Sequence, residues 1–227
     1  MMNQNIAIDG PAGAGKSTIA KRVAQQLQLI YVDTGAMYRA MGIYFHRLGI
    51  DPADEVAISR AVCGAEVSLE YRNGAQQVIL NGENVTRLLR TEEAGRMASL
   101  CSVYAAVRTK MVQLQQGLAA RTAVIMDGRD IGTVVLPDAL LKVYLTASVS
   151  ERARRRYLEL TEKGEACDLA EIERGIRARD EQDMNRPIGP LRQAEDAVLV
   201  DASNLNIDEV VEVILDLYEK ARREKGA

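Results

Sequence analysis

Short apolar runs alternate with longer stretches in which apolar residues recur every three or four positions. The short runs have the length of single buried strands, and the longer stretches have the spacing of amphipathic helices. The predicted strands cover residues 5–9, 29–32, 123–126, 141–145 and 197–200. The predicted helices follow residue 18 and cover 37–48, 52–63, two stretches that end near 118, 149–185 with a break near Gly164, and 207–223. Strands that alternate with helices predict an α/β fold with a parallel sheet and helices on both faces.

The pattern changes between residues 66 and 86. Residues 66–71 and 77–80 alternate between apolar and polar side chains, which is typical of half-buried strands. The Asn-Gly pair at 73–74 between them is a hairpin turn signal. We therefore expect a small antiparallel β insert within the α/β chain.

Composition narrows the class of ligand. The net charge is −3 and aromatic residues make up only 4% of the 227 residues, which argues against nucleic acid or an anionic membrane as a partner. Arginines nevertheless crowd two stretches, 152–156 and 174–186. An acidic protein with local arginine clusters suits a small anionic ligand better than a polyanion.

Cysteine and histidine usage excludes several kinds of site. The three cysteines are far apart and form no C-x-x-C pair, so neither a disulfide framework nor a zinc site is indicated. His46 is the only histidine, which argues against a catalytic triad. Reduced thiols and the lack of an apolar run of transmembrane length predict a cytoplasmic protein.

Residues 10–17, Gly-Pro-Ala-Gly-Ala-Gly-Lys-Ser, match the phosphate-loop motif G-x-x-x-x-G-K-[ST]. Its glycines let backbone N–H groups surround a phosphate, Lys16 supplies a positive charge, and Ser17 can reach Mg²⁺. A chance match is disfavoured because the motif follows a predicted strand and opens a predicted helix. We expect Lys16 to be an exposed loop residue.

Residues 33–39 stand at the end of a predicted strand, where doubly wound sheets bind ligands. Asp33 and Thr34 can also cap the following helix, and both interpretations stay open. Arg39 lies about one turn into that helix and could reach a phosphate near its start. The alternative for Arg39 is a solvated helix side chain.

Asp127-Gly128-Arg129-Asp130 follows another predicted strand. Asp127 is placed like the Walker-B acid that helps to hold Mg²⁺ in P-loop proteins. Gly128 permits a turn, so Arg129 and Asp130 can point into the same crevice.

Arg179, Asp183 and Arg186 share one face of a helix if the helix persists that far. A surface ion-pair ladder is the simpler interpretation of such spacing. The prolines that follow, Pro187 and Pro190, favour a face beside a loop instead.

These segments together resemble the bacterial cytidylate kinase family. The resemblance rests on IAIDGPAGAGKST, DTGAMYR, RTEEAGRMAS, MDGRDIGTVVLPDA and RDEQDMNR, and it covers essentially the whole chain. The β insert is itself a mark of this family. The resemblance implies a P-loop kinase unit with a core at about 1–35, 120–150 and 188–227, a monophosphate-binding region at about 36–119, and a lid at about 151–187.

The resemblance also implies a role for each matched residue. The CMP phosphate would be surrounded by Asp33, Thr34, Arg39, Arg129 and Arg186. The cytosine would be contacted by Ser99, Arg108 and Asp130, and the sugar region by Arg179 and Asp183. ATP would be held by Gly10, Pro11, Ala12, Gly13, Ala14, Gly15, Lys16, Ser17 and Thr18, and Mg²⁺ by Ser17 and Asp127. The catalytic charges would be Lys16, Arg39, Arg129, Arg186 and one of the lid arginines Arg154, Arg155 and Arg156, for which we choose Arg155.

The implied activity is a nucleoside monophosphate kinase that transfers the γ-phosphate of ATP to CMP, and to dCMP as well. The attacking phosphate oxygen is already ionised at neutral pH, so no general base is required. We expect a monomer whose partners are these nucleotides, with neither nucleic acid nor membrane. Two alternatives stay open: a kinase for UMP or another small acceptor, and a non-catalytic protein that only binds ATP.

Overall fold

The computed structural model describes residues 4–72 and 74–226, and the chain divides into two compact units. Unit 1 contains Met1–Tyr31 and Thr122–Ala227, and unit 2 contains Val32–Arg121. Asn73, the first residue of the predicted hairpin turn, lies outside the described residues.

A five-stranded sheet forms the centre of unit 1. Its order is β2-β6-β1-β7-β8, and the pairs β1–β6, β1–β7 and β7–β8 are parallel. The strands are β1 (Ile6–Asp9), β2 (Ile30–Asp33), β6 (Val124–Gly128), β7 (Leu141–Thr146) and β8 (Val198–Asp201), and the last two residues of β2 are counted with unit 2. All five predicted strands are therefore confirmed, each within two residues of its expected bounds.

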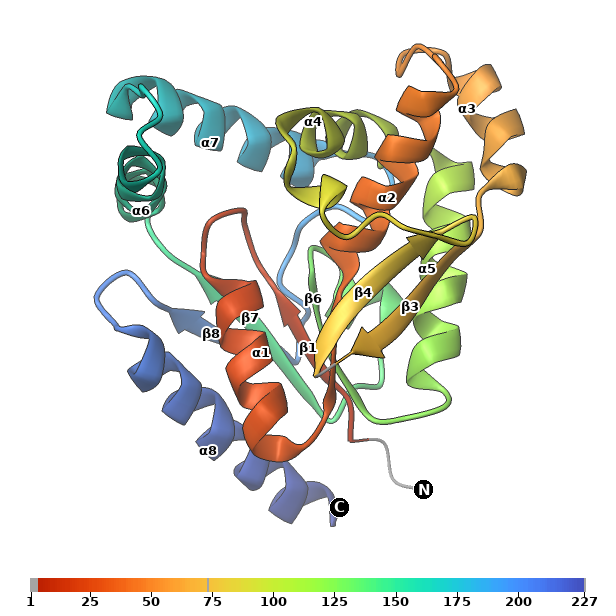
Figure 1. Cartoon of the computed structure of the whole chain (residues 1–227). Helices are drawn as coiled ribbons and strands as arrows, with labels where there is room; N and C mark the ends of the chain where they lie inside the picture. Colours follow the sequence, from red (N-terminus) through yellow and green to blue (C-terminus); the bar gives the residue numbers. More distant parts are fainter. Residues whose placement is uncertain (1–3, 73, 227) are drawn as a thin grey trace. The chain divides into compact units, whose positions relative to one another are not determined.

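Helices flank this sheet, which confirms the predicted α/β class. Unit 1 contains α1 (Lys16–Leu27), a single π-helical turn (Ile131–Val135), α6 (Val149–Glu162), α7 (Leu169–Asn185) and α8 (Ile207–Lys225). Helices α1 and α8 lie side by side and share one hydrophobic cluster with the strands (Figure 1). Val23 of α1 and Ile214 of α8 are fully buried there beside Ile6 and Ile8 of β1. Burial of these apolar stripes fixes α1, and with it the loop that precedes it.

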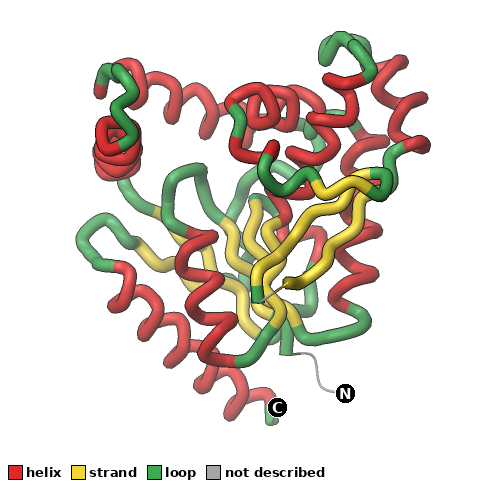
Figure 2. The backbone as a smooth tube through the Cα atoms, in the orientation of Figure 1, coloured by secondary structure: helices red, strands yellow, loops and turns green. Residues whose placement is uncertain are grey.

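Unit 2 combines helices with a small separate sheet. Its helices are α2 (Thr34–Arg47), α3 (Glu55–Ala61), α4 (Glu92–Cys101) and α5 (Ala105–Ala119), with short 3₁₀ turns at Val62–Gly64 and Leu88–Arg90. Strands β3 (Val67–Arg72), β4 (Ala75–Leu80) and β5 (Glu83–Asn84) pair antiparallel in that order (Figure 2). This confirms the predicted β insert and adds the short strand β5 to it.

Gly42 brings α2 and α4 together within unit 2. A Cβ at this position would lie 2.8 Å from the backbone nitrogen of Ala98, closer than any side chain can approach.

Across residues 4–72 and 74–226, no helix has both the length and the apolar character that crossing a membrane would require.

Candidate active site

The phosphate loop in unit 1 connects β1 to α1 and depends on its glycines. A Cβ on Gly10 would lie 1.9 Å from the carbonyl oxygen of Leu145, so only glycine fits there. Gly13 and Gly15 have φ angles of 79° and 92°, in the left-handed region that favours glycine. Gly15 is the N-cap of α1, whose first turn contains no acidic residue. Because the loop leads into the N-terminus of α1, the positive end of the helix dipole lies beside the loop, and no acidic side chain offsets it there. This arrangement suits an anion.

Lys16 is buried, which corrects the expectation of an exposed loop residue. It is the first residue of α1, only 6% of its surface is exposed, and its Nζ donates a hydrogen bond to the carbonyl oxygen of Pro11 at 2.7 Å. Burial lowers the pKa of Lys16 to about 7, and nearby Arg129 acts in the same direction. Three carboxylates oppose this shift: Asp127, Asp9 and Asp183. A bound polyphosphate would favour the charged lysine further.

Ser17 and Asp127 form an oxygen-rich pair next to Lys16. The Ser17 hydroxyl donates to Oδ2 of Asp127 at 2.8 Å, and Asp127 is only 5% exposed at the end of β6. Within the described ranges no group of three or more metal-binding side chains occurs. Mg²⁺ commonly uses one or two protein oxygens together with phosphates and waters, so this donor set fits the ion of a Mg·ATP complex.

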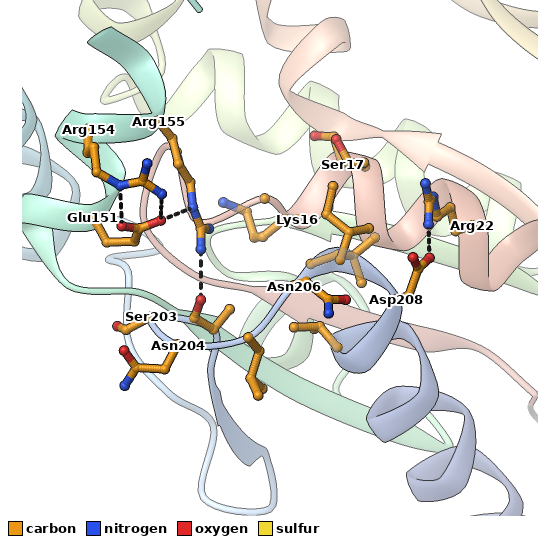
Figure 3. A pocket seen from close by; sticks show the side chains of 18 residues that line it. Lys16, Ser17, Arg22, Glu151, Arg154, Arg155, Ser203, Asn204, Asn206 and Asp208 are labelled. Atoms are coloured by element: carbon orange, nitrogen blue, oxygen red, sulfur yellow. Dashed lines mark hydrogen bonds and ion pairs between the residues drawn. The ribbon is translucent and has the colours of Figure 1, made fainter. Parts of the chain in front are cut away.

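A large pocket opens beside the phosphate loop within unit 1. Its volume is about 1010 Å³, and it is lined by the loop, the start of α6 and the connection between β8 and α8 (Figure 3). Polar side chains from that connection include Ser203, Asn204 and Asn206. This segment was not among the predicted site residues because it contains no motif. Its position after a strand of a parallel sheet was the signal that could have indicated it.

Two of the three predicted lid arginines line this pocket. Glu151 accepts hydrogen bonds from Nε of Arg154 and Nε of Arg155, both at 2.8 Å (Figure 3). These bonds, that of Arg154 above all, hold the pKa of Glu151 at about 2. Arg155 also donates to the carbonyl oxygen of Ala202 at 2.7 Å. Arg156 instead pairs with Glu159 on the exposed side of α6.

Arg152 is a buried arginine to which the sequence analysis assigned no role. Only 3% of it is exposed, and it donates to the carbonyl oxygens of Ala147 and Ala12 at 2.9 and 3.0 Å. Its guanidinium also forms a bidentate pair with Asp180 of α7, with distances of 3.1 and 2.6 Å. Arg152 therefore connects the phosphate loop, α6 and α7 inside unit 1.

The predicted residues of the 127–130 segment and of α7 meet within unit 1. Nε of Arg129 donates to Oδ2 of Asp183 at 2.6 Å. Arg186 lies 3.5 Å from Asp130 and 3.9 Å from Asp183. Although burial opposes it, the charge of Arg129 holds the pKa of Asp183 below its usual value. Asp183 and Arg186 are each 8% exposed, so a surface ion-pair ladder is the wrong interpretation for them, while Arg179 is exposed.

Asp9 organises the turn that follows Asp130, a contact the sequence analysis also missed. Its two carboxylate oxygens accept the backbone N–H groups of Ile131 and Gly132, both at 2.7 Å. Burial raises the pKa of Asp9 to about 6, although these two donors oppose the shift. The last residue of β1 thereby holds the loop that carries Arg129 and Asp130.

The remaining predicted residues lie in unit 2. Asp33 caps α2 by accepting the N–H of Ala36 at 2.8 Å, and it also pairs with Arg39 at 3.1 Å. The helix-cap interpretation of Asp33 is thus confirmed, and Arg39 turns back to the start of its own helix.

Arg108 of α5 is 3% exposed and lies over the ring of Tyr38 at 5.9 Å. Thr34 is buried at the start of α2, and Ser99 is half-buried on α4.

The parallel sheet, the glycine-shaped loop and the Lys16–Ser17–Asp127 cluster define the class of P-loop kinases. A solved shikimate kinase from Bacteroides thetaiotaomicron shares this fold, with a TM-score of 0.50 and 14% identity. That match covers 96% of this chain and 99% of the other.

Closer relatives identify the family. The family model described as cytidylate kinase matches residues 6–220. A cytidylate kinase of Shouchella clausii is 49% identical over 97% of this chain and 98% of its own. A cytidylate kinase of Desulfitobacterium hafniense is 50% identical over 95% and 93%. The chain belongs to the cytidylate kinase family.

Proposed function

We propose that the protein transfers the γ-phosphate of ATP to CMP, giving ADP and CDP, and that it also accepts dCMP. The observation that supports this most strongly is the family match over residues 6–220 in a chain that keeps Lys16, Ser17 and Asp127 together. A protein that only bound ATP would not need the second set of buried charged residues around Arg129 and Asp183.

ATP binds at the phosphate loop, with its base and ribose in the pocket beside it. The loop residues that bind its phosphates are Gly10, Pro11, Ala12, Gly13, Ala14, Gly15, Lys16, Ser17 and Thr18. Ser17 and Asp127 hold Mg²⁺, which neutralises charge on the phosphates. Arg155 is the lid arginine that acts on the transferred group, and its position on the pocket wall supports this choice over Arg156.

The residues proposed for CMP are those that the family resemblance implies. The residues proposed for its phosphate are Asp33, Thr34, Arg39, Arg129 and Arg186. Those for its base are Ser99, Arg108 and Asp130, and those for its sugar are Arg179 and Asp183. Because the attacking oxygen is already ionised, catalysis consists of orienting it and stabilising charge, by Lys16, Arg39, Arg129, Arg155 and Arg186.

The segment 151–187 serves as a lid that excludes water from the transfer. Its two helices carry Arg155 on one side and the buried pair of Arg152 and Asp180 between them. Limited proteolysis should cut this segment in the free protein and spare it when ATP and CMP are both bound. Equal cleavage in both states would contradict a closing lid.

We further propose that the protein works as a cytoplasmic monomer on these nucleotides alone. Its net charge of −3 supports a partner that is neither nucleic acid nor membrane, and its separated cysteines support a reducing compartment.

A panel of acceptors tests the proposal. ADP formation is measured with CMP, dCMP, UMP, AMP and no acceptor, at equal concentrations. We expect turnover with CMP and dCMP, less with UMP, and none without an acceptor. Turnover that prefers another acceptor would favour the alternative of a different small-molecule kinase. ATP binding without any turnover would favour a non-catalytic protein.

A further inference from the structure

Two hydroxyl groups donate hydrogen bonds to the Asp127 carboxylate, one to each oxygen. Ser17 Oγ lies 2.8 Å from Oδ2, and Tyr31 Oη lies 2.8 Å from Oδ1. Ser17 belongs to the phosphate-loop motif, whereas Tyr31 lies in β2 and has no role in the function proposed above. Both Tyr31 and Asp127 are buried, with 8% and 5% of their surfaces exposed.

We propose that Tyr31 is a positioning residue for the metal site, because its hydroxyl holds the carboxylate of Asp127 in one orientation toward Ser17. This inference rests on the proposed function, in which Ser17 and Asp127 serve the Mg²⁺ of Mg·ATP. Tyr31 contacts neither nucleotide in this proposal and acts only through Asp127.

The geometry supports this role because a hydroxyl donor meets each oxygen of the Asp127 carboxylate. The terminal torsion of an aspartate has broad minima, so burial alone does not select one orientation of its two oxygens. The Tyr31 ring is itself held in place. It is part of the hydrophobic cluster of unit 1, and Nζ of Lys21 lies 5.4 Å from its centroid. A fixed donor on Oδ1 therefore leaves Oδ2 directed at the Ser17 hydroxyl.

A purely structural hydrogen bond is the competing explanation. In that case the loss of the Tyr31 hydroxyl would lower stability but would not change how much Mg²⁺ strengthens ATP binding. Partners that orient a metal-binding side chain typically contribute about 10- to 100-fold to metal affinity. The ratio of ATP affinity with Mg²⁺ to ATP affinity with EDTA, here called the metal increment, separates the two explanations.

Calorimetric ATP binding to the full chain measures this increment in wild type, Tyr31→Phe and Tyr218→Phe. Tyr218 is a matched control because it is 3% exposed in the same hydrophobic cluster. We expect Tyr31→Phe to reduce the metal increment by about tenfold, the low end of that range, and to leave metal-free ATP affinity unchanged. Tyr218→Phe should keep the wild-type increment. If the Tyr31→Phe variant has the same metal increment as the wild type, the inference is wrong, whereas the proposed function still stands.

The same substitution in an Asp127→Asn background tests whether Tyr31 acts through Asp127. We expect Tyr31→Phe to cause no further loss of the increment there. A further loss of the same size would overturn the inference, because Tyr31 would then act by another route. A wild-type protein that fails to bind ATP, with or without Mg²⁺, would contradict the proposed function itself and the inference with it.

Discussion

The carboxylate of Asp130 lies 3.5 Å from the guanidinium of Arg186, and both side chains are more than nine-tenths buried. Asp130 is one of the residues proposed to contact the base, so this contact bears on the proposed preference for CMP over UMP. A carboxylate can accept the N4 amino group of cytosine but would face the O4 acceptor of uracil with no proton between them. Asp130 also pairs with Arg186, so the competing explanation is that Asp130 belongs only to the ion-pair cluster and does not contact the base.

The first prediction is that Asp130→Ala narrows the preference for CMP over UMP, mainly by loss of activity on CMP. One buried mismatch of this kind costs about 1–3 kcal/mol, or about fivefold to 150-fold in selectivity. Steady-state kcat/KM for both nucleotides measures it. Glu173→Ala is the control, since Glu173 pairs with Arg177 at a more exposed position and should leave the CMP/UMP ratio unchanged. If Asp130→Ala leaves the CMP/UMP ratio unchanged, Asp130 only shapes the loop.

The second prediction concerns the buried pair of Arg152 and Asp180. Asp180→Asn removes the charge opposite a guanidinium that is 3% exposed, so the free energy of unfolding should fall by about 3–5 kcal/mol. Glu173→Gln on the same helix is the matched control, because its pair with Arg177 is more exposed and should contribute at most about 1 kcal/mol. Urea unfolding of both variants measures the difference. Equal losses would show that the buried pair does not hold α6 and α7.

The third prediction is that ATP binding takes up a proton above neutral pH. The pKa of Lys16 is lowered to about 7 in the free protein, so Lys16 becomes neutral as the pH rises, while the bound phosphates favour its charged form. The affinity should therefore be flat below about pH 7 and fall by up to about tenfold per pH unit above it. Calorimetry in buffers with different heats of ionisation measures the number of protons that the protein takes up when ATP binds.

Lys220→Met is the control for this proton uptake, because Lys220 is exposed on α8. It should keep the wild-type pH dependence, whereas Lys16→Met should lose both the dependence and most of the affinity. An affinity that stays constant between about pH 7 and pH 9 would mean that Lys16 is already charged before ATP binds.

Local patterns predicted the strands, the β insert and the phosphate loop, because apolar period and glycine spacing are properties of short segments. They could not predict that Lys16 is buried, since its burial comes from chain segments far away in the sequence. The same holds for the contact between Tyr31 and Asp127, which are 96 residues apart, and for Arg152 with Asp180. Asp183 and Arg186 were identified by spacing, but only packing could show that they are buried.

In the proposed reaction a phosphoryl group passes directly from ATP to CMP. Incubation with γ-labelled ATP, CMP and Mg²⁺, followed by separation of the nucleotides, measures where the label goes. We expect label in CDP in equal amount to the ADP formed, little in inorganic phosphate, and almost none in CDP with the Lys16→Met variant. Label found mainly in inorganic phosphate, or transferred to UMP or AMP in preference to CMP, would contradict it.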